Sequence, residues 1–254
     1  MNAIFLAAGV FVVLGLATGL GMVFRDRLPS HHLNSESKEV IRLATAIVGT
    51  LSALALGLLI ASAKSDYDAA QTELDATAAR IVLLDRLMAQ YGAEASDARV
   101  LLRELIQGRL DSGWTIESSD DDTAERTPLY RQIETVQGKL RALDPQDQVH
   151  RLIQARALEV SGHVAEGHWL QIESADEGLP CRFVIVLIYW LALLFCTFGL
   201  QAPANPTVLT IIIVCALSVA GAVYAISDMA NPYAGLMQIS DKPLEGALAR
   251  LGNS

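Results

Sequence analysis

Four stretches of the chain are almost purely apolar, and each is long enough to cross a membrane as a helix. They cover residues 3–24, 40–63, 183–200 and 207–227. At about 1.5 Å of rise per residue, roughly 17 to 25 apolar residues span a bilayer core. The only charge inside these stretches is Arg42, close enough to one end to reach the lipid headgroups. The pattern therefore predicts four transmembrane helices.

A cleaved secretory signal is the alternative interpretation of the first stretch. Such a signal needs basic residues before its apolar part and a small-residue cleavage pattern after it. No basic residue precedes Ala3, and Arg25-Asp26-Arg27 follows the apolar run directly. These features favour a transmembrane helix that stays in the mature chain.

The short connections indicate how the spans are oriented. The first two spans are joined by a loop with four basic residues, Arg25, Arg27, Lys38 and Arg42. Lys and Arg in short loops favour the cytoplasmic side. Two prolines in the connection from Gln201 to Pro206 end one helix before the next begins, which predicts a tight hairpin on that same side. We therefore expect a multi-pass membrane protein with its N-terminus, the segment between spans two and three, and its C-terminus outside.

The segment between the second and third spans is polar and carries helical patterns. No Gly or Pro stands between Lys64 and Leu74, so the second helix is expected to continue out of the membrane and to stop at Gly92. Its apolar positions recur at intervals of three, four and seven residues: Tyr67, Leu74, Ala78, Ile81, Leu84 or Asp85, and Met88. This spacing is typical of an amphipathic helix.

Three further helices are predicted in this segment. One covers about residues 94–110, one begins at Thr127-Pro128, and one begins at Asp144-Pro145 and runs to about Ala175. Residues 111–126, with three consecutive aspartates, are expected to form an exposed loop. The apolar positions of the three helices are Ala98, Leu101, Leu102, Leu105 and Ile106; Leu129, Ile133, Val136, Leu140 and Leu143; and Val149, Leu152, Ile153, Val160 and Val164.

The predicted fold is all-α, with four transmembrane helices and a helical bundle inserted between the second and third spans. We divide the chain into residues 1–63 with spans one and two, 64–181 with the bundle, 182–228 with spans three and four, and 229–254 with a turn and a short amphipathic helix. That last helix is expected from about Asp241 to Leu251, docked on the bundle or on lipid.

Composition and charge agree with this division and exclude some functions. The mean hydropathy of +0.36 is too apolar for an ordinary soluble domain. Residues 64–182 hold 13 basic and 22 acidic residues, a net charge of −9 that equals the net charge of the whole chain. An acidic chain without clustered Lys and Arg is not expected to bind nucleic acid. The three cysteines, Cys181, Cys196 and Cys215, lie in or beside the last two spans, so we expect no disulfide framework.

Few residues are candidates for chemistry. Glu159, His163 and Glu166 share one helix face at i, i+4 and i+7, as metal ligands can. Arg156 on the same face favours a solvated surface, so this set is only a weak metal candidate. The His31-His32 pair and the aspartates at 120–122 are interpreted as solvated loop residues. Without a catalytic motif, we predict a protein that is not an enzyme and holds no metal or cofactor.

Small residues recur in the spans. They stand at Gly49, Ala53, Gly57 and Ala61 in the second span, and at Gly15 and Gly19 in the first. Such rows let helices approach closely in lipid. Two interpretations stay open: packing between spans of one subunit, or contact between subunits or a pore lining. No ionisable group lies at mid-depth, which disfavours a proton-coupled transporter but not a pore with an apolar constriction.

Three stretches resemble the bacterial bestrophin-like family, a domain of unknown function. They are Ala55-Leu-Gly-Leu-Leu-Ile-Ala-Ser-Ala-Lys-Ser-Asp-Tyr-Asp68, Leu84-Asp-Arg-Leu-Met-Ala-Gln-Tyr-Gly92 and Asn231-Pro-Tyr-Ala-Gly-Leu-Met-Gln-Ile-Ser240. The family has an acidic residue and a Pro-aromatic-x-Gly turn after the fourth span. Asp228 and Pro232-Tyr233-x-Gly235 are similar, although Asp228 is separated from the proline and Tyr replaces the commoner Phe. The family name implies kinship to anion channels.

The leading hypothesis is a homo-oligomeric ion channel in the lipid bilayer. The residues expected nearest the ion path are the small-residue row of the second span and its exit, Lys64, Asp66, Tyr67 and Asp68. The alternative is a non-enzymatic membrane sensor or scaffold whose acidic bundle binds a partner. In that case the second helix, continuous from the membrane into the bundle, would transmit the signal.

Overall fold

The computed structural model describes residues 3–29, 35–112, 128–176, 181–203, 205–233 and 235–251. These residues form helices joined by short connections and include no β-strand, which confirms the all-α prediction. The helices are α1 (Ala3–Arg27), α2 (Ser35–Tyr91), a short 3-10 helix η2 (Ala93–Ala95), α3 (Ser96–Ser112), α4 (Pro128–Arg141), α5 (Gln148–Asp176), α6 (Cys181–Gln201), α7 (Pro206–Met229) and α8 (Lys242–Arg250). Four of them, α1, α2, α6 and α7, are long and apolar enough to cross a membrane.

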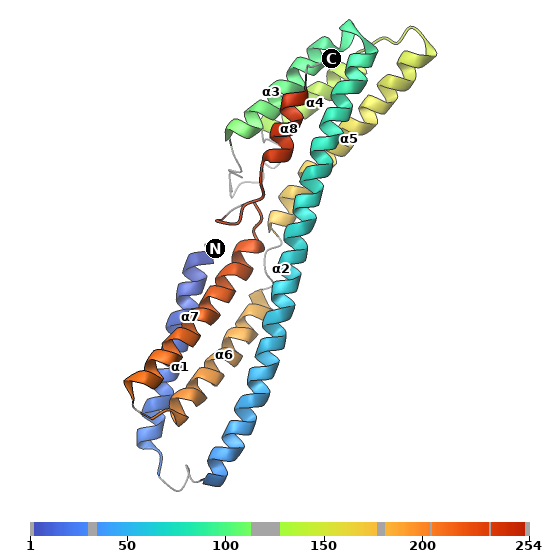
Figure 1. Cartoon of the computed structure of the whole chain (residues 1–254). Coiled ribbons are helices and arrows are strands. Elements are labelled where there is room, and N and C mark those ends of the chain that lie inside the picture. The colour runs from blue at the N-terminus through green and yellow to red at the C-terminus, as the bar shows by residue number, and fades with distance from the viewer. Residues whose placement is uncertain are drawn as a thin grey trace. The chain divides into compact units, whose positions relative to one another are not determined.

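The chain forms two compact units, each built from two separate segments. Unit 1 contains residues 1–67 and 177–237, and unit 2 contains residues 68–176 and 238–254. In unit 1, α1, α6 and α7 run side by side (Figure 1). Their core contains Leu14 of α1, Phe195 of α6 and Val223 of α7. The hairpin between α6 and α7 is as predicted, since α6 ends at Gln201 and α7 begins at Pro206.

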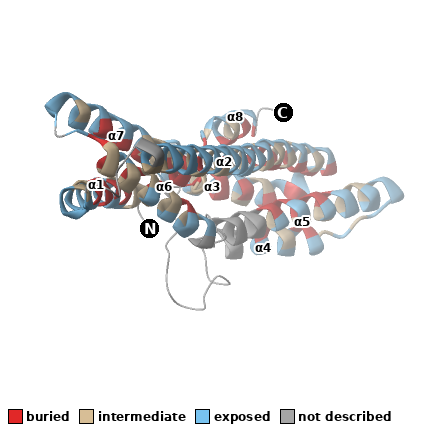
Figure 2. Cartoon of the chain, turned by 90° about the horizontal axis from the view of Figure 1, so that it is seen from below, coloured by how far each residue is buried: buried red, intermediate tan, exposed pale blue. Residues whose placement is uncertain are grey.

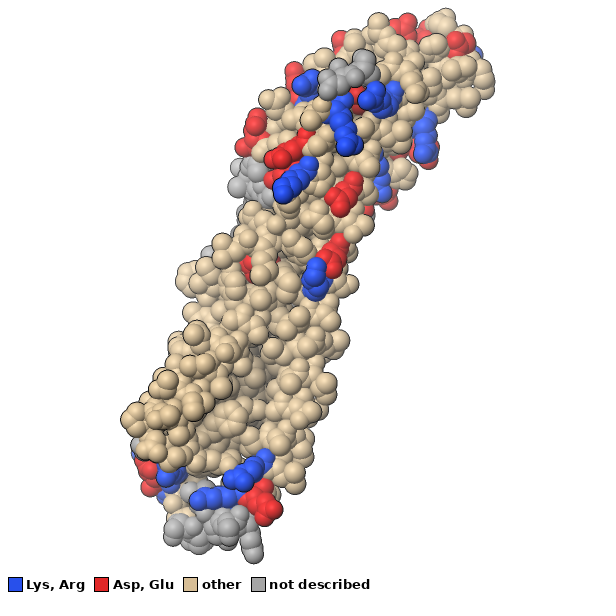
Figure 3. All heavy atoms as spheres, in the orientation of Figure 1, with Lys and Arg blue, Asp and Glu red and all other residues tan. Residues whose placement is uncertain are grey.

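The outer surface of unit 1 is apolar. Large side chains such as Phe5, Leu58 and Phe183 are exposed on the spans. Charged side chains gather at the end of the unit where α2 begins and leave the span surface beyond it almost free of charge (Figure 3). A soluble protein rarely exposes so much contiguous apolar surface, whereas a lipid-facing surface requires it. The chain is therefore a membrane protein.

Helix α2 is a single unbroken helix of 57 residues, about 85 Å long at the normal rise. It continues beyond Ala63 without a break, which confirms the predicted continuation of the second helix. It ends where predicted, because Gly92 has φ +114°, a conformation that favours glycine. Exposed positions predominate on its first part, up to residue 69, and buried positions become frequent from Leu74 onward (Figure 2).

Unit 2 has the core of an ordinary helical bundle. The stripe of α2 is buried from Leu74 to Met88, and both alternatives at its fourth position, Leu84 and Asp85, are buried. Helices α3, α4 and α5 contribute further apolar side chains, Leu102, Leu105, Val136, Leu140, Val160 and Val164. Polar residues cover the outside, so the periodicity of the sequence located this core correctly.

Two expectations for α5 are wrong. The helix begins at Gln148 and not at the Asp144-Pro145 pair, because the Asp147 carboxylate accepts the backbone N–H of His150 at 2.8 Å and caps the helix. Val149 and Leu152 are each 62% exposed. Leu152 lies about 100° from the buried face, and Val149 belongs to the first turn.

The C-terminal helix belongs to unit 2. The open alternatives for this helix were the bundle and lipid, and α8 packs on α3 with Leu244 and Ala247 buried. Arg103 of α3 also donates to the carbonyl oxygen of Leu251 at 3.4 Å. Segments on either side of α6 and α7 thus share one unit. They must lie on the same side of the membrane, which agrees with two crossings between them.

Candidate functional site

The row of small residues on α2 turns away from the neighbouring spans. Gly49 lies against α6, and a Cβ added there would lie 3.1 Å from Leu194 Cδ1. Ala53, Gly57 and Ala61 are exposed in the single chain, and a Cβ added at Gly57 would meet no atom within 4 Å. Residues four apart advance about 40° around a helix, so the row winds from α6 to the outer surface. The single chain covers only the beginning of the row.

The opposite side of α2 packs within unit 1. Ser52 and Ala63 are buried, and Leu56 and Leu59 lie against the core of α1, α6 and α7. Three hydroxyl groups of this span are satisfied within the helix: Thr45 donates to Ile41 O at 2.7 Å, Thr50 to Ala46 O at 2.9 Å and Ser52 to Val48 O at 2.8 Å. These three groups therefore need no further hydrogen-bond partner in lipid.

Charged side chains are grouped on the surface where the second span ends. Lys64, Asp66 and Asp68 are exposed, and Tyr67 is half-buried. The Lys64 ammonium lies 5.4 Å from the centre of the Tyr67 ring, within the range of a cation–π contact. Between Arg42 and Lys64 the sequence of α2 has no ionisable residue. The predicted exit residues thus lie where the apolar span ends.

The closest helix contact in unit 1 uses glycines that the sequence analysis did not select. A Cβ added at Gly21 of α1 would overlap the carbonyl oxygen of Cys196, and one added at Gly199 of α6 would overlap that of Thr18. A Cβ at the predicted positions Gly15 and Gly19 would meet no atom within 4 Å. In the single chain, Gly15 and Gly19 therefore have no close neighbour, and the close helix contact lies at Gly21 and Gly199 instead. The choice between packing within one subunit and contact between subunits stays open for the predicted pair.

The end of the fourth span holds a buried carboxylate. Asp228 is 2% exposed, although it belongs to a helix of membrane-spanning length. Its Oδ1 accepts the backbone N–H of Leu236 at 3.2 Å, and its Oδ2 accepts that of Met237 at 2.8 Å. The Tyr224 hydroxyl donates to Oδ1 at 3.4 Å. The carboxylate therefore ties the turn that follows α7 back onto the helix.

Glycine is required in this turn. Gly235 has φ +112°, and a Cβ added there would overlap Asp228 Oδ1. Pro232 and Tyr233 are buried, and Leu236 is 82% exposed. The acidic residue and the Pro-aromatic-x-Gly turn are therefore parts of one structural element, although seven positions separate Asp228 from Gly235. The sequence pattern pointed to both residues but not to their contact.

Unit 2 contains a buried ion pair that the sequence analysis missed. Asp85 of α2 accepts two hydrogen bonds from Arg99 of α3, from Nε to Oδ1 at 2.8 Å and from Nη2 to Oδ2 at 3.1 Å. The Asp85 side chain is 3% exposed and that of Arg99 is 22% exposed. The hydrogen bond to Asp85 also raises the pKa of Arg99 above its ordinary value. In the sequence, the only sign of this carboxylate was that either Leu84 or Asp85 could occupy one position of the apolar stripe of α2.

The weak metal candidates do not gather around one point. Glu159 forms an ion pair with Arg156 at 2.8 Å, and His163 Nδ1 lies 3.3 Å from Glu166. Among the residues that the structure describes, no three His, Cys, Asp or Glu side chains are arranged to hold a metal ion. His31-His32 and the aspartates at 120–122 lie outside the described residues.

Four long apolar helices and a lipid-facing surface define a helical membrane protein with several spans. The chain belongs to the bestrophin-like family, because the family model described as the Bestrophin-like domain matches residues 11–244. This match covers three candidate spans completely, the first span from residue 11 onward, and most of unit 2, and it confirms the resemblance seen in the sequence. No curated protein and no solved structure matches the chain.

Proposed function

We propose that several copies of this protein assemble around the outward faces of α2 and conduct ions between them. The observation that carries the proposal is the exposure of Ala53, Gly57 and Ala61 in the single chain. Small residues lower the distance at which two helices can meet in lipid, and an exposed row gives a second copy a place to pack. Closed rings of identical subunits are a common form of such assemblies.

The core of unit 1 supports a path between copies better than a path through one copy. Leu14, Leu191 and Phe195 fill the space between α1 and α6. Helix α2 has no ionisable residue between Arg42 and Lys64, so the path would have an apolar constriction that closes by excluding water. Lys64, Asp66 and Asp68 would then form the charged mouth of the path. The family name, with its implied kinship to anion channels, supports the same proposal.

Reconstitution of the full chain in liposomes tests conduction. Wild-type protein should give conductance above that of empty liposomes for anions, cations or both. Gly57→Leu places a large side chain on the α2 face and should abolish or strongly reduce the conductance. Gly221→Leu is the matched control, because Gly221 is an exposed glycine of α7 with equally open space around it. Absence of wild-type conductance for every ion tested would reject the proposal.

The subunit number tests assembly separately. Native mass spectrometry of the detergent-solubilised chain should show one defined oligomer, and Gly57→Leu should shift it toward the monomer while Gly221→Leu should not. A wild-type monomer under mild detergent conditions would contradict the proposed assembly even if vesicles were leaky.

A sensor or scaffold is the second candidate, and the unbroken course of α2 supports it. A helix that continues from the span to Tyr91 without a break can carry a displacement from one end to the other. In that case a defined partner should bind unit 2 while reconstituted protein conducts no ions. We propose neither an enzymatic role nor a resident metal or cofactor.

For orientation, we propose that unit 2 and both termini lie outside the inner membrane. The basic residues Arg25, Arg27, Lys38 and Arg42 between the first two spans support this placement. Labelling with an impermeant reagent should reach a cysteine introduced for Lys139 in intact spheroplasts but not one introduced for Arg27. The reverse pattern would invert the topology.

A further inference from the structure

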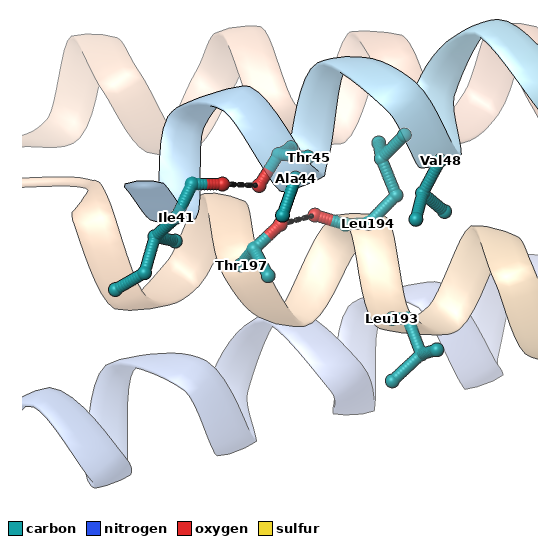
Figure 4. Close-up of a pocket in the computed structure, with 7 residues that line it drawn as sticks. All are labelled: Ile41, Ala44, Thr45, Val48, Leu193, Leu194 and Thr197. Atoms are coloured by element: carbon teal, nitrogen blue, oxygen red, sulfur yellow. Dashed lines mark hydrogen bonds between the residues drawn. The ribbon is translucent and has the colours of Figure 1, made fainter. Parts of the chain in front are cut away.

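A groove between α2 and α6 lies within unit 1. It has a volume of about 260 Å³ and is lined by Ile41, Ala44, Thr45 and Val48 of α2 and by Leu193, Leu194 and Thr197 of α6 (Figure 4). It lies on the N-terminal side of Gly49, where α2 and α6 approach each other. About three turns near the start of α2, from Lys38 to Gly49, thus combine a charged end with an apolar recess.

The groove suits a hydrocarbon chain. Its two hydroxyl groups are satisfied by their own helices, since Thr45 donates to Ile41 O and Thr197 donates to Leu194 O, both at 2.7 Å (Figure 4). A ligand in the groove therefore meets methyl and methylene groups and no free donor. The volume is slightly below the roughly 300 to 1,000 Å³ of sites for drug-sized ligands, which favours a narrow, flexible occupant.

The charges beside the groove determine which kind of molecule with a hydrocarbon chain fits there. Lys38, Ile41, Thr45 and Val48 follow at i, i+3, i+7 and i+10, so Lys38 continues the row that lines the groove. Arg42 stands one position after Ile41 and three before Thr45. Both basic side chains are exposed. They lie where an apolar span begins, which is the depth of phosphate groups in a bilayer.

The nearest acidic residue does not cancel this charge at the groove. Glu39 lies about 170° around α2 from the centre of the groove residues, whereas Lys38 lies about 70° and Arg42 about 110° from it. A long lysine or arginine side chain can cover such an angle and place its charged end over the groove. The mouth is therefore basic.

We propose that the α2–α6 groove binds one acyl chain of an anionic phospholipid, whose headgroup phosphate is held by Lys38 and Arg42. The site rests on the membrane placement of the chain and does not depend on ion conduction. A bound lipid would cover apolar surface that α2 and α6 leave open and would fix the start of α2 against α6. It would thus act as a structural ligand of unit 1.

Native mass spectrometry of the full chain tests the site with two probes, phosphatidylglycerol and phosphatidylcholine with the same acyl chains. Wild-type protein should retain phosphatidylglycerol in preference to phosphatidylcholine. The double variant Lys38→Gln/Arg42→Gln should weaken retention of phosphatidylglycerol by about tenfold or more. Arg27→Gln, an exposed arginine at the end of α1, is the matched charge control and should have a smaller effect.

A second pair of variants tests the groove itself. Ala44→Trp fills the groove and should remove the tightly held lipid, whereas Ala46→Trp adds the same side chain to an exposed position on the opposite side of α2. Equal retention of the two lipids by the wild type would overturn the proposal. The proposal would also be overturned if Ala44→Trp changed the subunit number without loss of lipid. That result would mean that a second copy of the chain covers the groove.

A third measurement keeps every groove residue native. Trp190 lies on α6 three and seven positions before Leu193 and Thr197, so it shares their face. With Trp114 and Trp169 replaced by Phe, its fluorescence should be quenched more by phosphatidylglycerol with brominated chains than by brominated phosphatidylcholine at the same mole fraction. Equal quenching would overturn the proposal even if Ala44→Trp does not fold.

Discussion

The two units are both bundles of helices, but they are held together in opposite ways. Unit 1 exposes large apolar side chains and brings α1 and α6 together backbone to backbone at Gly21 and Gly199. Unit 2 buries most of its large apolar side chains and joins α2 to α3 with a buried ion pair. In lipid, apolar burial gives no net gain, so close contact of small residues must replace it. In water, the hydrophobic effect stabilises the core directly.

The largest expected effect is on the glycine contact of unit 1. Gly21→Leu should destabilise the protein by about 4 kcal/mol or more, because the new side chain overlaps the backbone at Cys196 and cannot be relieved by a rotamer change. Gly15→Leu on the same helix has open space and should change stability by about 0.5 kcal/mol or less. Unfolding in SDS followed by circular dichroism measures both. Equal effects would show that α1 and α6 do not meet at Gly21.

The ion pair of unit 2 should give the next largest effect. Asp85→Ala leaves the Arg99 guanidinium partly buried without its carboxylate and should cost about 3 to 5 kcal/mol. Asp97→Ala breaks the exposed pair with Lys139 and should cost about 1 kcal/mol or less. Hydrogen exchange of α2 and α3 distinguishes the two variants. If Asp85→Ala is as mild as Asp97→Ala, the buried pair does not stabilise unit 2.

The turn after α7 should respond more modestly. Asp228→Ala removes the acceptors of the Leu236 and Met237 N–H groups and should cost about 2 kcal/mol. Residues 231–237 should then be cleaved faster in limited proteolysis than in the wild type. Asp26→Ala, an exposed aspartate at the end of α1, is the control. Unchanged proteolysis in Asp228→Ala would mean that the turn is held by other contacts.

The smallest effect concerns the cap of α5 and depends on pH. The backbone N–H of His150 and then its imidazole lower the pKa of Asp147 below its ordinary value of 3.8. A lowered pKa stabilises the folded state above the unfolded value and loses this contribution as pH falls through the folded value. The stability difference between wild type and Asp147→Asn should therefore be constant near neutral pH and should shrink below about pH 4. A difference that grows on acidification would contradict the assigned cap.

The sequence predicted the elements better than their contacts. The hairpin prolines, the continuation of α2 and its stop at Gly92 depend on local backbone chemistry, so they could be inferred. The helix contact at Gly21 could not, because several glycines lie on α1 and only the crossing point with α6 selects one. The Asp85–Arg99 pair likewise depends on how two helices are placed side by side. Asp147 was missed because Asp144-Pro145 imitates a helix start three residues earlier.

The same limit applies to the candidate site. Sequence periodicity found the row from Gly49 to Ala61 but left open whether it packs inside one chain. The fold answers only for the single copy, in which Ala53, Gly57 and Ala61 are exposed. Contact between copies stays a prediction. The contact of Asp228 with Gly235 shows the same limit at short range, since a positive φ and an oxygen acceptor meet only once the turn has formed.

The docking of α8 on α3 has a consequence for biosynthesis. The ribosome completes residues 68–176 well before it reaches 238–254, and the two last spans must enter the bilayer in between. Until then Leu244 and Ala247 cannot pack on α3. Part of the apolar surface of α3 therefore faces water. Unit 2 can thus close only after residues 238–254 have been synthesised, and chains truncated after the fourth span should yield products that quality-control proteases remove.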